Sequence, residues 1–312
     1  MADAILTEAR FTGEESARRH LEAIRWPNGP ICPHCGGADR QSRLNGQAHR
    51  SGVIFCGHCR EQYTVTVGTV FEHSKVPLHK WLAATHLLCA SKKGISSKQI
   101  ERMLGVTYKT AWFMTHRIRE AMRSEGLAPM GRGGGGVEID ETYIGRDPAK
   151  SKPRHGPAHK QRVLSLVDRN SGRAYSIVAD DLHMKTLVPI LRENIAREAI
   201  LLTDGAAFYK PASISFAGHE AVDHKSGEYV RRTNHLVHTN TVEGFFSIFK
   251  RGMRGVYQHC GKQHLHRYLA EFDFRYSERE KLGVNDSQRS AKALRGIGGK
   301  RLTYRRIDQA TG

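Results

Sequence analysis

The sequence predicts an α/β catalytic domain with a mixed sheet, preceded by a small metal-binding domain and a helical domain. Strand-like and helical patterns alternate in the second half of the chain, which indicates an α/β layer architecture. Near the N-terminus four cysteines form two C-x2-C pairs, and two short helical patterns then meet at a glycine. The segments that we expect are residues 15–75, 76–128, 137–280 and 281–312.

The chain is strongly basic, with 49 lysines and arginines against 31 acidic residues in 312, a formal net charge of +18. This excess predicts an anionic partner, above all nucleic acid, with general basicity as the alternative. No stretch approaches the roughly 18 consecutive apolar residues of a membrane span. The first residues also lack the basic and apolar regions of a signal peptide. We therefore expect a cytoplasmic protein with no membrane partner and with reduced cysteines.

Cys32 and Cys35 form one C-x2-C pair, and Cys56 and Cys59 form the other, after twenty intervening residues. Two knuckles at this separation can deliver four thiolates to one tetrahedral Zn2+. Short strand-like runs between and after the pairs complete the pattern of a zinc ribbon. Four cysteines close the coordination sphere, so the zinc is expected to be structural. Disulfides are the alternative, but they suit a secreted protein.

Residues 96–122 carry two helical patterns joined by a turn at Gly105. Ser96 or Ser97 can cap the first helix, and Thr107 can cap the second. This arrangement predicts a helix-turn-helix DNA-binding domain, with a helical bundle that only packs as the alternative. The second helix is expected to expose groups suited to phosphates and base edges, namely Tyr108, Lys109, His116, Arg117 and Arg119.

The catalytic segment follows residues 129–136, whose glycines predict a flexible linker. Strands are expected at residues 137–144, 162–168, 174–178 and 199–203, and helices at 183–196 and 240–251. Asp140 lies within the first strand and Asp204 ends the last one. A carboxylate at such a place is costly unless it is paired or metal-bound. The order resembles the ribonuclease H-like nuclease fold, which places one acid on its first strand and another after its fourth.

Glu243 lies on the last predicted helix, two turns before Lys250, so the two share one face. Three converging carboxylates can bind two divalent ions about 4 Å apart, which serve the attacking and leaving oxygens of a phosphodiester. Mg2+ suits such a site because it prefers carboxylate, phosphate and water oxygens. Lys250 could hold a DNA phosphate beside the metals, with Arg251 and Arg254 nearby.

Each acid also has a structural alternative. Asp140 could be a solvated strand residue, with Glu138 on the same face as a rival for its role. Asp204 precedes a glycine and could be a turn aspartate. Glu243 could simply compensate the helix dipole. The joint occurrence of all three in suitable elements favours a shared site.

Four segments carry a family resemblance, namely residues 137–145, 201–205, 238–252 and 271–276. With the ribbon and the helix-turn-helix before them, they resemble bacterial insertion-sequence transposases of the ISXO-like, Merlin-related type. The resemblance implies a DDE triad of Asp140, Asp204 and Glu243, with Lys250 as the associated basic residue. Asn240 remains the alternative to Glu243.

The resemblance implies a transposase that binds inverted repeats, hydrolyses the DNA ends and joins each 3′-OH to target DNA by transesterification. Its cofactors would be two Mg2+ or Mn2+ ions besides structural Zn2+, and it would act as a homo-oligomer on DNA. The alternatives are a DNA-binding regulator without catalysis and a nuclease that cuts without joining. The basic segment 281–312 is expected to be a partly disordered arm on DNA phosphates.

Overall fold

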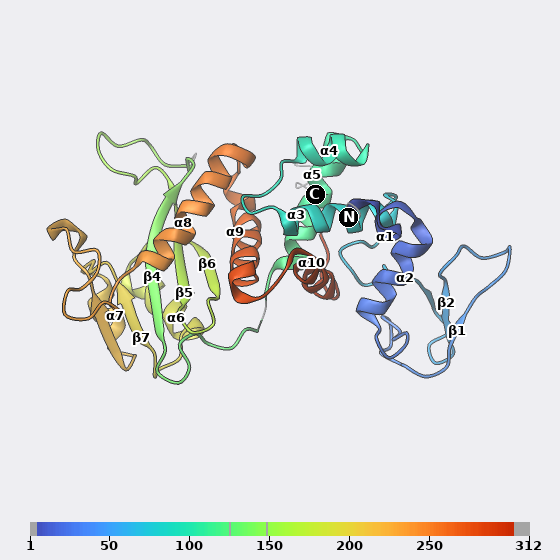
Figure 1. Ribbon diagram of the computed structural model, residues 1–312, viewed down its shortest axis with the longest axis horizontal. Helices are drawn as coiled ribbons and strands as arrows, with labels where there is room; N and C mark the ends of the chain where they lie inside the picture. The colour runs from blue at the N-terminus through green and yellow to red at the C-terminus, as the bar shows by residue number, and fades with distance from the viewer. Residues whose placement is uncertain (1–4, 125, 148, 303–312) are drawn as a thin grey trace. The chain divides into compact units, whose positions relative to one another are not determined.

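The computed structural model describes residues 5–124, 126–147 and 149–302 (Figure 1). These residues divide into two compact units. The first unit contains residues 5–91, 95–123 and 285–302, and the second contains residues 92–94, 124, 126–147 and 149–284. Within these ranges no helix combines the length and apolar character that a membrane span requires.

The first unit begins with two helices and a small antiparallel sheet. Their bounds are α1 (Ala9–Thr12), α2 (Glu14–Arg25), β1 (Gln41–Arg43), β2 (Ile54–Cys56) and β3 (Gln62–Tyr63), with strand order β1-β2-β3. Glu22 of α2 accepts from Arg43 of β1 at 2.7 Å, and Arg25 donates to the carbonyl oxygen of Val65 at 2.6 Å. These contacts fasten the sheet to α2.

Three helices follow, α3 (Leu78–Ala90), α4 (Ser97–Leu104) and α5 (Tyr108–Met122). Ser96 caps α4 in a reciprocal capping box with Gln99, and Thr107 accepts from the N–H of Thr110 at the start of α5. Between the two helices Gly105 has a φ of +57°, a left-handed conformation that glycine adopts without strain. The predicted helix, turn and helix are therefore confirmed.

The segment predicted to be a partly disordered arm contains a helix at residues 286–295, so the prediction was wrong for that part of the segment. Here α10 (Asp286–Arg295) packs against α2, α3 and α5. Leu294 and Ile297 are buried, and Arg289 donates to the carbonyl oxygen of Cys89 at 2.8 Å. Among its basic residues α10 carries a short apolar stripe, and this stripe packs against the other helices of the first unit. Residues 303–312 lie outside the described residues.

The second unit is built on a five-stranded mixed sheet. Its strands are β4 (Gly136–Ile144), β5 (Gln161–Asp168), β6 (Ala174–Ala179), β7 (Ile200–Thr203) and β8 (Gly218–Ala221), in the order β6-β5-β4-β7-β8. β4, β5 and β6 pair antiparallel, whereas β7 runs parallel to β4 and to β8. The predicted mixed sheet is confirmed, and β8 is an additional edge strand.

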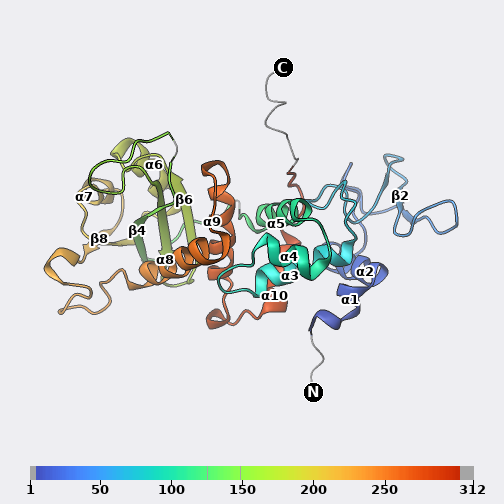
Figure 2. The same ribbon diagram turned by 90° about the horizontal axis from the view of Figure 1, so that it is seen from above.

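Helices cover both faces of this sheet, as the edge-on view of Figure 2 shows. The helices are α6 (Met184–Asn194), α7 (Tyr209–Ser213), α8 (Asn240–Gly252) and α9 (Lys262–Ser277). Val137 and Ile139 of β4 pack with α6, whereas Val163 and Val167 of β5 pack with α8 and α9. Alternation along the strands therefore assigns even-numbered residues of β4 to the α8 face.

The glycine-rich stretch before β4 is ordered, so the prediction of a flexible linker was wrong. Met130 is buried and bridges to Ile195, and the N–H of Gly131 donates to Asp168 at 2.9 Å. Gly131 has a φ of +73°, and a Cβ there would lie 2.5 Å from that of Ala199. The glycine is needed for this close approach of the backbone.

Candidate active site

Asp140 and Asp204 meet where the parallel ladder between β4 and β7 ends. The last paired residues are Glu138 and Leu202. Asp140 and Asp204 each follow their strand's last pair by two residues, so the register sets them beside one another. On its other side Asp140 pairs with Ser165 of β5. The predicted position of both acids is therefore explained by one register.

Glu243 lies in the first turn of α8, on the face of the sheet toward which Asp140 points. The buried hydroxyl of Thr239 donates to Glu243 Oε1 at 3.1 Å, and His224 Nε2 lies 3.4 Å from the same oxygen. His224 also lies 3.1 Å from Thr239 Oγ1. These two neighbours hold one carboxylate oxygen of Glu243 in place. Asn240 is exposed and does not line the cleft with it.

A cleft of about 440 Å3 brings the three acids together. It is lined by Asp140, Glu141, Asp204, His224, Glu243, Phe246, Ser247 and Lys250. Sequence reasoning missed Glu141 and His224. Glu141 had a signal, since it directly follows Asp140, whereas His224 arrives from a distant loop and had none.

The electrostatics of this cleft suit a divalent cation. Burial, together with the neighbouring carboxylates of Glu141, Asp204 and Glu243, raises the pKa of Asp140 to about 8. Converging carboxylates repel one another unless a cation lies between them. Carboxylate oxygens are also the ligands that Mg2+ prefers. The donor set and its charge therefore fit a magnesium or manganese ion.

Glu141 also lines the cleft, and its carboxylate is held by a buried tyrosine. The buried hydroxyl of Tyr209 donates to Glu141 Oε2 at 3.0 Å. Burial raises the pKa of Glu141, and the nearby Asp204 adds to this shift. Burial likewise raises the pKa of Tyr209 well above its ordinary value, so the phenol remains a hydrogen-bond donor. Glu141 thus adds a fourth acid to the cleft.

Glu138, the rival of Asp140, is instead committed to the fold. Its side chain is completely buried, and its Oε2 accepts from the backbone N–H groups of Thr241 and Val242 at 2.8 and 2.9 Å. Its Oε1 accepts from Arg169 at 2.7 Å. A carboxylate at a helix N-terminus is favoured by the unpaired N–H groups and the helix dipole. Glu138 therefore anchors α8 to β4, immediately before Glu243.

Of the basic residues predicted to lie near Glu243, one lines the cleft and two lie outside it. Lys250 lines the cleft, and its ammonium lies 5.8 Å from the ring centroid of Phe246. Arg251 and Arg254 are exposed beyond the cleft, and Arg251 donates to Ser247. Of the three, Lys250 alone shares the cleft with the acids, while both arginines remain candidates for contacts with DNA further out.

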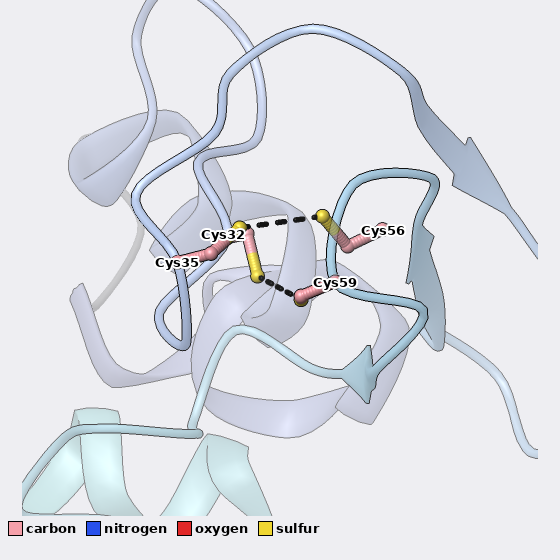
Figure 3. Close-up of side chains that lie close together, drawn as sticks. All are labelled: Cys32, Cys35, Cys56 and Cys59. Atoms are coloured by element: carbon pink, nitrogen blue, oxygen red, sulfur yellow. Dashed lines mark hydrogen bonds between the residues drawn. The ribbon is translucent and has the colours of Figure 1, made fainter.

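The four cysteines of the ribbon converge on one point (Figure 3). Their sulfur atoms all lie within 4.8 Å of one another, and two pairs, Cys32 with Cys59 and Cys35 with Cys56, are 3.6 Å apart. Four thiolates bound tetrahedrally to zinc at about 2.3 Å would be roughly 3.8 Å apart. The cluster therefore fits the predicted structural zinc site.

Hydrogen bonds also favour a thiolate at Cys56. The backbone N–H of Cys59 donates to its sulfur, as does the side-chain amide of Gln41 at 3.4 Å. These donors lower the pKa of Cys56 to about 6. Because zinc binds thiolates, the donors prepare the site for the metal.

The helix-turn-helix exposes fewer candidate DNA contacts than its sequence predicted. Tyr108 is 45% exposed at the start of α5, and Lys109 is exposed beside it. His116, Arg117 and Arg119 are buried, so their predicted exposure was wrong. Arg117 donates to the backbone carbonyl oxygens of Glu72 at 3.0 Å and Leu302 at 3.2 Å. Its place is in the core of the first unit.

The segment 271–276 near the end of α9 serves packing. Glu271 is completely buried and pairs with Arg275 at 2.8 Å. Asp273 accepts from both the N–H and the hydroxyl of Ser176 on β6, each at 2.7 Å. These contacts fix α9 on the sheet beside α8.

Comparison with known proteins agrees with this arrangement. Residues 133–277 match the ISXO2-like transposase domain, and residues 12–62 match a transposase zinc-ribbon domain. A protein of transposable element ISH50 from Halobacterium salinarum is 31% identical over 284 residues, which cover 85% of this chain and 91% of the relative. A transposase-like protein of Haemophilus influenzae is 26% identical over 108 residues, 35% of this chain and 84% of that protein.

The comparisons and the site agree on one assignment. The matched transposase domain spans every acid of the cleft, and the matched ribbon spans all four clustered cysteines. The ISH50 relative extends the similarity over most of the chain. The chain therefore belongs to the ISXO2-like family of insertion-sequence transposases.

Proposed function

We propose that this protein is a DNA transposase that cleaves the ends of its element and joins them to target DNA. The observation that carries the proposal is the cleft in which Asp140, Asp204 and Glu243 converge from a strand, a strand end and a helix. Three carboxylates that line one cleft serve no evident purpose in a protein that only binds polyanionic DNA.

The three acids would hold Mg2+ or Mn2+. Two such ions, when bound, activate the attacking oxygen and stabilise the leaving oxygen of a phosphodiester. Thr239 and His224 support Glu243, and Tyr209 supports Glu141, so the carboxylates keep their directions before metal and DNA arrive. Such preorganisation favours the transition state.

Two successive reactions at this cleft account for transposition. In the first, a water oxygen bonds to phosphorus at the element end, and the bond to the 3′ oxygen breaks to leave a 3′-OH. In the second, that 3′ oxygen bonds to a target phosphorus and displaces a target 3′ oxygen, which leaves as a hydroxyl. Each step exchanges one P–O bond for another, so no covalent protein intermediate is needed. Lys250 would hold the phosphate in the cleft.

DNA recognition would be divided between specific and general contacts. Tyr108 and Lys109 at the exposed start of α5 are the candidates for reading the inverted repeats. Arg251 and Arg254 would contact phosphates beside the cleft without reading sequence. Joining two ends of one element requires two cleavage sites, which favours a homo-oligomer on DNA.

One assay separates this proposal from its alternatives. The full chain is incubated with labelled inverted-repeat DNA and a target plasmid, with and without Mg2+. We expect labelled strand to become joined to the plasmid only when Mg2+ is present. Cutting without joining would indicate a nuclease, and binding without either reaction would indicate a regulator. Both of these results would contradict the proposal.

A further inference from the structure

We propose that the loop between β4 and β5 is a second DNA-contacting element of the catalytic unit, which grips the phosphate backbone of duplex DNA beside the cleft. The loop comprises residues 145–147 and 149–160 and is called the β4–β5 loop below (Figure 1, light green beyond the end of β4). This inference rests on the proposed function, since it concerns how the transposase holds its DNA.

The length of this loop is unusual for its position. Antiparallel neighbours such as β4 and β5 are commonly joined by about two to five residues, and loops beyond about 12–15 residues usually serve a function or are disordered. The β4–β5 loop is longer than this and is fixed at its base. The N–H of Asp147 donates to the carbonyl oxygen of His159 at 2.8 Å, and Gln161 donates to that of Arg146 at 3.3 Å.

An ion pair between a buried carboxylate and an exposed lysine adds to this anchor. Asp147 is 2% exposed and accepts from Lys262, at the start of α9, at 3.2 Å. Lys150 approaches the same carboxylate at 3.8 Å. Asp147 is the single acid of the loop sequence, and its negative charge is neutralised by these two lysines. The remainder of the loop therefore extends from a fixed base without an acid of its own.

The charge beyond this base is entirely positive. Residues 149–160 contain four lysines and arginines, two histidines and no acid. Lys152 and Arg154 are exposed, and neither has an ion-pairing partner among the residues that the structure describes. Like charges this close repel one another, and a polyanion would relieve that repulsion.

The composition favours phosphates over a protein partner or over bases. Residues 149–160 contain no phenylalanine, tyrosine, tryptophan, methionine, leucine, isoleucine or valine that could anchor a protein interface. They also contain no asparagine or glutamine to read adenine, and no phenylalanine, tyrosine or tryptophan ring on which a base could stack. Lysines and arginines alone suit contacts with the backbone of duplex DNA of any sequence.

The β4–β5 loop begins close to the cleft, so it would contact DNA near the reacting phosphate. β4 and β7 run parallel, so the loop leaves β4 at the same edge of the sheet at which Asp204 ends β7. Ile144 lies four positions after Asp140, which corresponds to about 13 Å of strand. Neighbouring phosphates of one strand are about 3.4 Å apart along the helix axis, so this distance corresponds to about four nucleotides of duplex DNA.

The test compares two double variants of the full chain that remove equal charge. Lys152→Gln with Arg154→Gln changes the β4–β5 loop. Arg132→Gln with Arg197→Gln changes two exposed residues near the opposite ends of β4 and β7 and serves as the control. All four side chains are exposed, so both variants should fold, which far-UV circular dichroism would verify.

The first measurement is binding to duplex DNA of unrelated sequence as a function of salt, without Mg2+. Each phosphate contact contributes about 0.9 to the slope of log affinity against log salt. We expect the loop variant to lower this slope by about 1.8 and the affinity in 0.1 M salt on the order of tenfold. An unchanged slope, or an equal decrease in the control variant, would overturn the proposal.

The second measurement identifies which DNA the loop grips. End cleavage and joining are measured separately, with uncleaved ends in one reaction and precleaved ends plus target plasmid in the other. A loss of joining alone assigns the loop to target DNA, and a loss of cleavage assigns it to the element end. If the wild-type chain catalysed neither reaction, the proposed function would fail, while the salt titration would still decide whether the loop binds DNA.

Discussion

At the scale of single residues, two acids on the same face of β4 have opposite surroundings. Glu138 accepts hydrogen bonds from Arg169 and from the N-terminus of α8, so its charge is compensated within the fold. Asp140 lies two residues further on among Glu141, Asp204 and Glu243, and burial together with these acids raises its pKa. One acid stabilises the fold, and the other destabilises it unless a cation binds.

This contrast predicts a gain in stability when Asp140 is changed to Asn. The pKa of Asp140 is about 8 in the folded chain and about 3.8 when unfolded. Its contribution to stability is therefore fully present below pH 3.8 and is lost as the pH rises toward 8. Without divalent cations at pH 8, Asp140→Asn should raise the free energy of unfolding by at least about 1 kcal/mol. Urea unfolding at pH 5 and pH 8 would measure it, and equal stability at pH 8 would contradict the shift.

The opposite result is expected for Glu138. Glu138→Gln leaves Arg169 partly buried without its carboxylate and places an amide against the N-terminus of α8. Removal of one member of a buried ion pair typically costs about 3–5 kcal/mol. The free energy of unfolding of the catalytic unit should fall by about 3 kcal/mol, as followed by far-UV circular dichroism in urea. Unchanged stability would show that Glu138 does not anchor α8.

At the scale of elements, the zinc ribbon makes a prediction about metal content. Cys56→Ser removes one of four sulfurs that lie within 4.8 Å of one another. Because structural zinc and ribbon folding are coupled, we expect the purified variant to lose nearly all of its zinc and the ribbon to become sensitive to protease. Cys89→Ser, a change at a buried cysteine outside the cluster, is the control and should keep zinc. Full zinc content in Cys56→Ser would refute the site.

Sequence patterns were informative for elements whose signals are local. The cap at Ser96, the turn at Gly105 and the strand that carries Asp140 all follow from neighbouring residues, and all are present. The burial of Arg117, by contrast, could not be predicted from neighbouring residues. Its helix has polar residues on most sides, and its burial depends on segments around residues 72 and 302, which the local pattern cannot reveal. The same holds for His224, which reaches the cleft from a distant loop.

At the scale of the whole molecule, the chain returns after the catalytic unit to complete the first unit. Leu294 and Ile297 are buried there, and the N–H of Val70 donates to the carbonyl oxygen of Ile297 at 3.1 Å. The basic composition of this segment had suggested a disordered arm, because charge dominates its sequence while its few apolar residues do the packing. Packing between segments so far apart in the sequence leaves no local sequence pattern from which it could be predicted.

Removal of residues 285–312 should therefore destabilise the first unit. Exposing the sites that Leu294 and Ile297 cover would cost roughly 3–5 kcal/mol. All three tryptophans, at positions 26, 81 and 112, belong to the first unit, so their fluorescence reports its unfolding in urea. We expect a lower midpoint for the truncated chain. An unchanged midpoint would indicate that the segment contributes nothing to that unit.

The proposed transposase activity requires above all that Asp140, Asp204 and Glu243 form one catalytic cation site. The most direct measurement is Mg2+-dependent joining of labelled inverted-repeat DNA to a target plasmid by variants that keep the repeat-binding unit intact. Asp140→Asn, Asp204→Asn and Glu243→Gln should each lower joining on the order of 100-fold or more, since the bound ions contribute several kcal/mol. Asn240→Ala should join normally. Activity retained by Glu243→Gln but lost in Asn240→Ala would contradict the assignment.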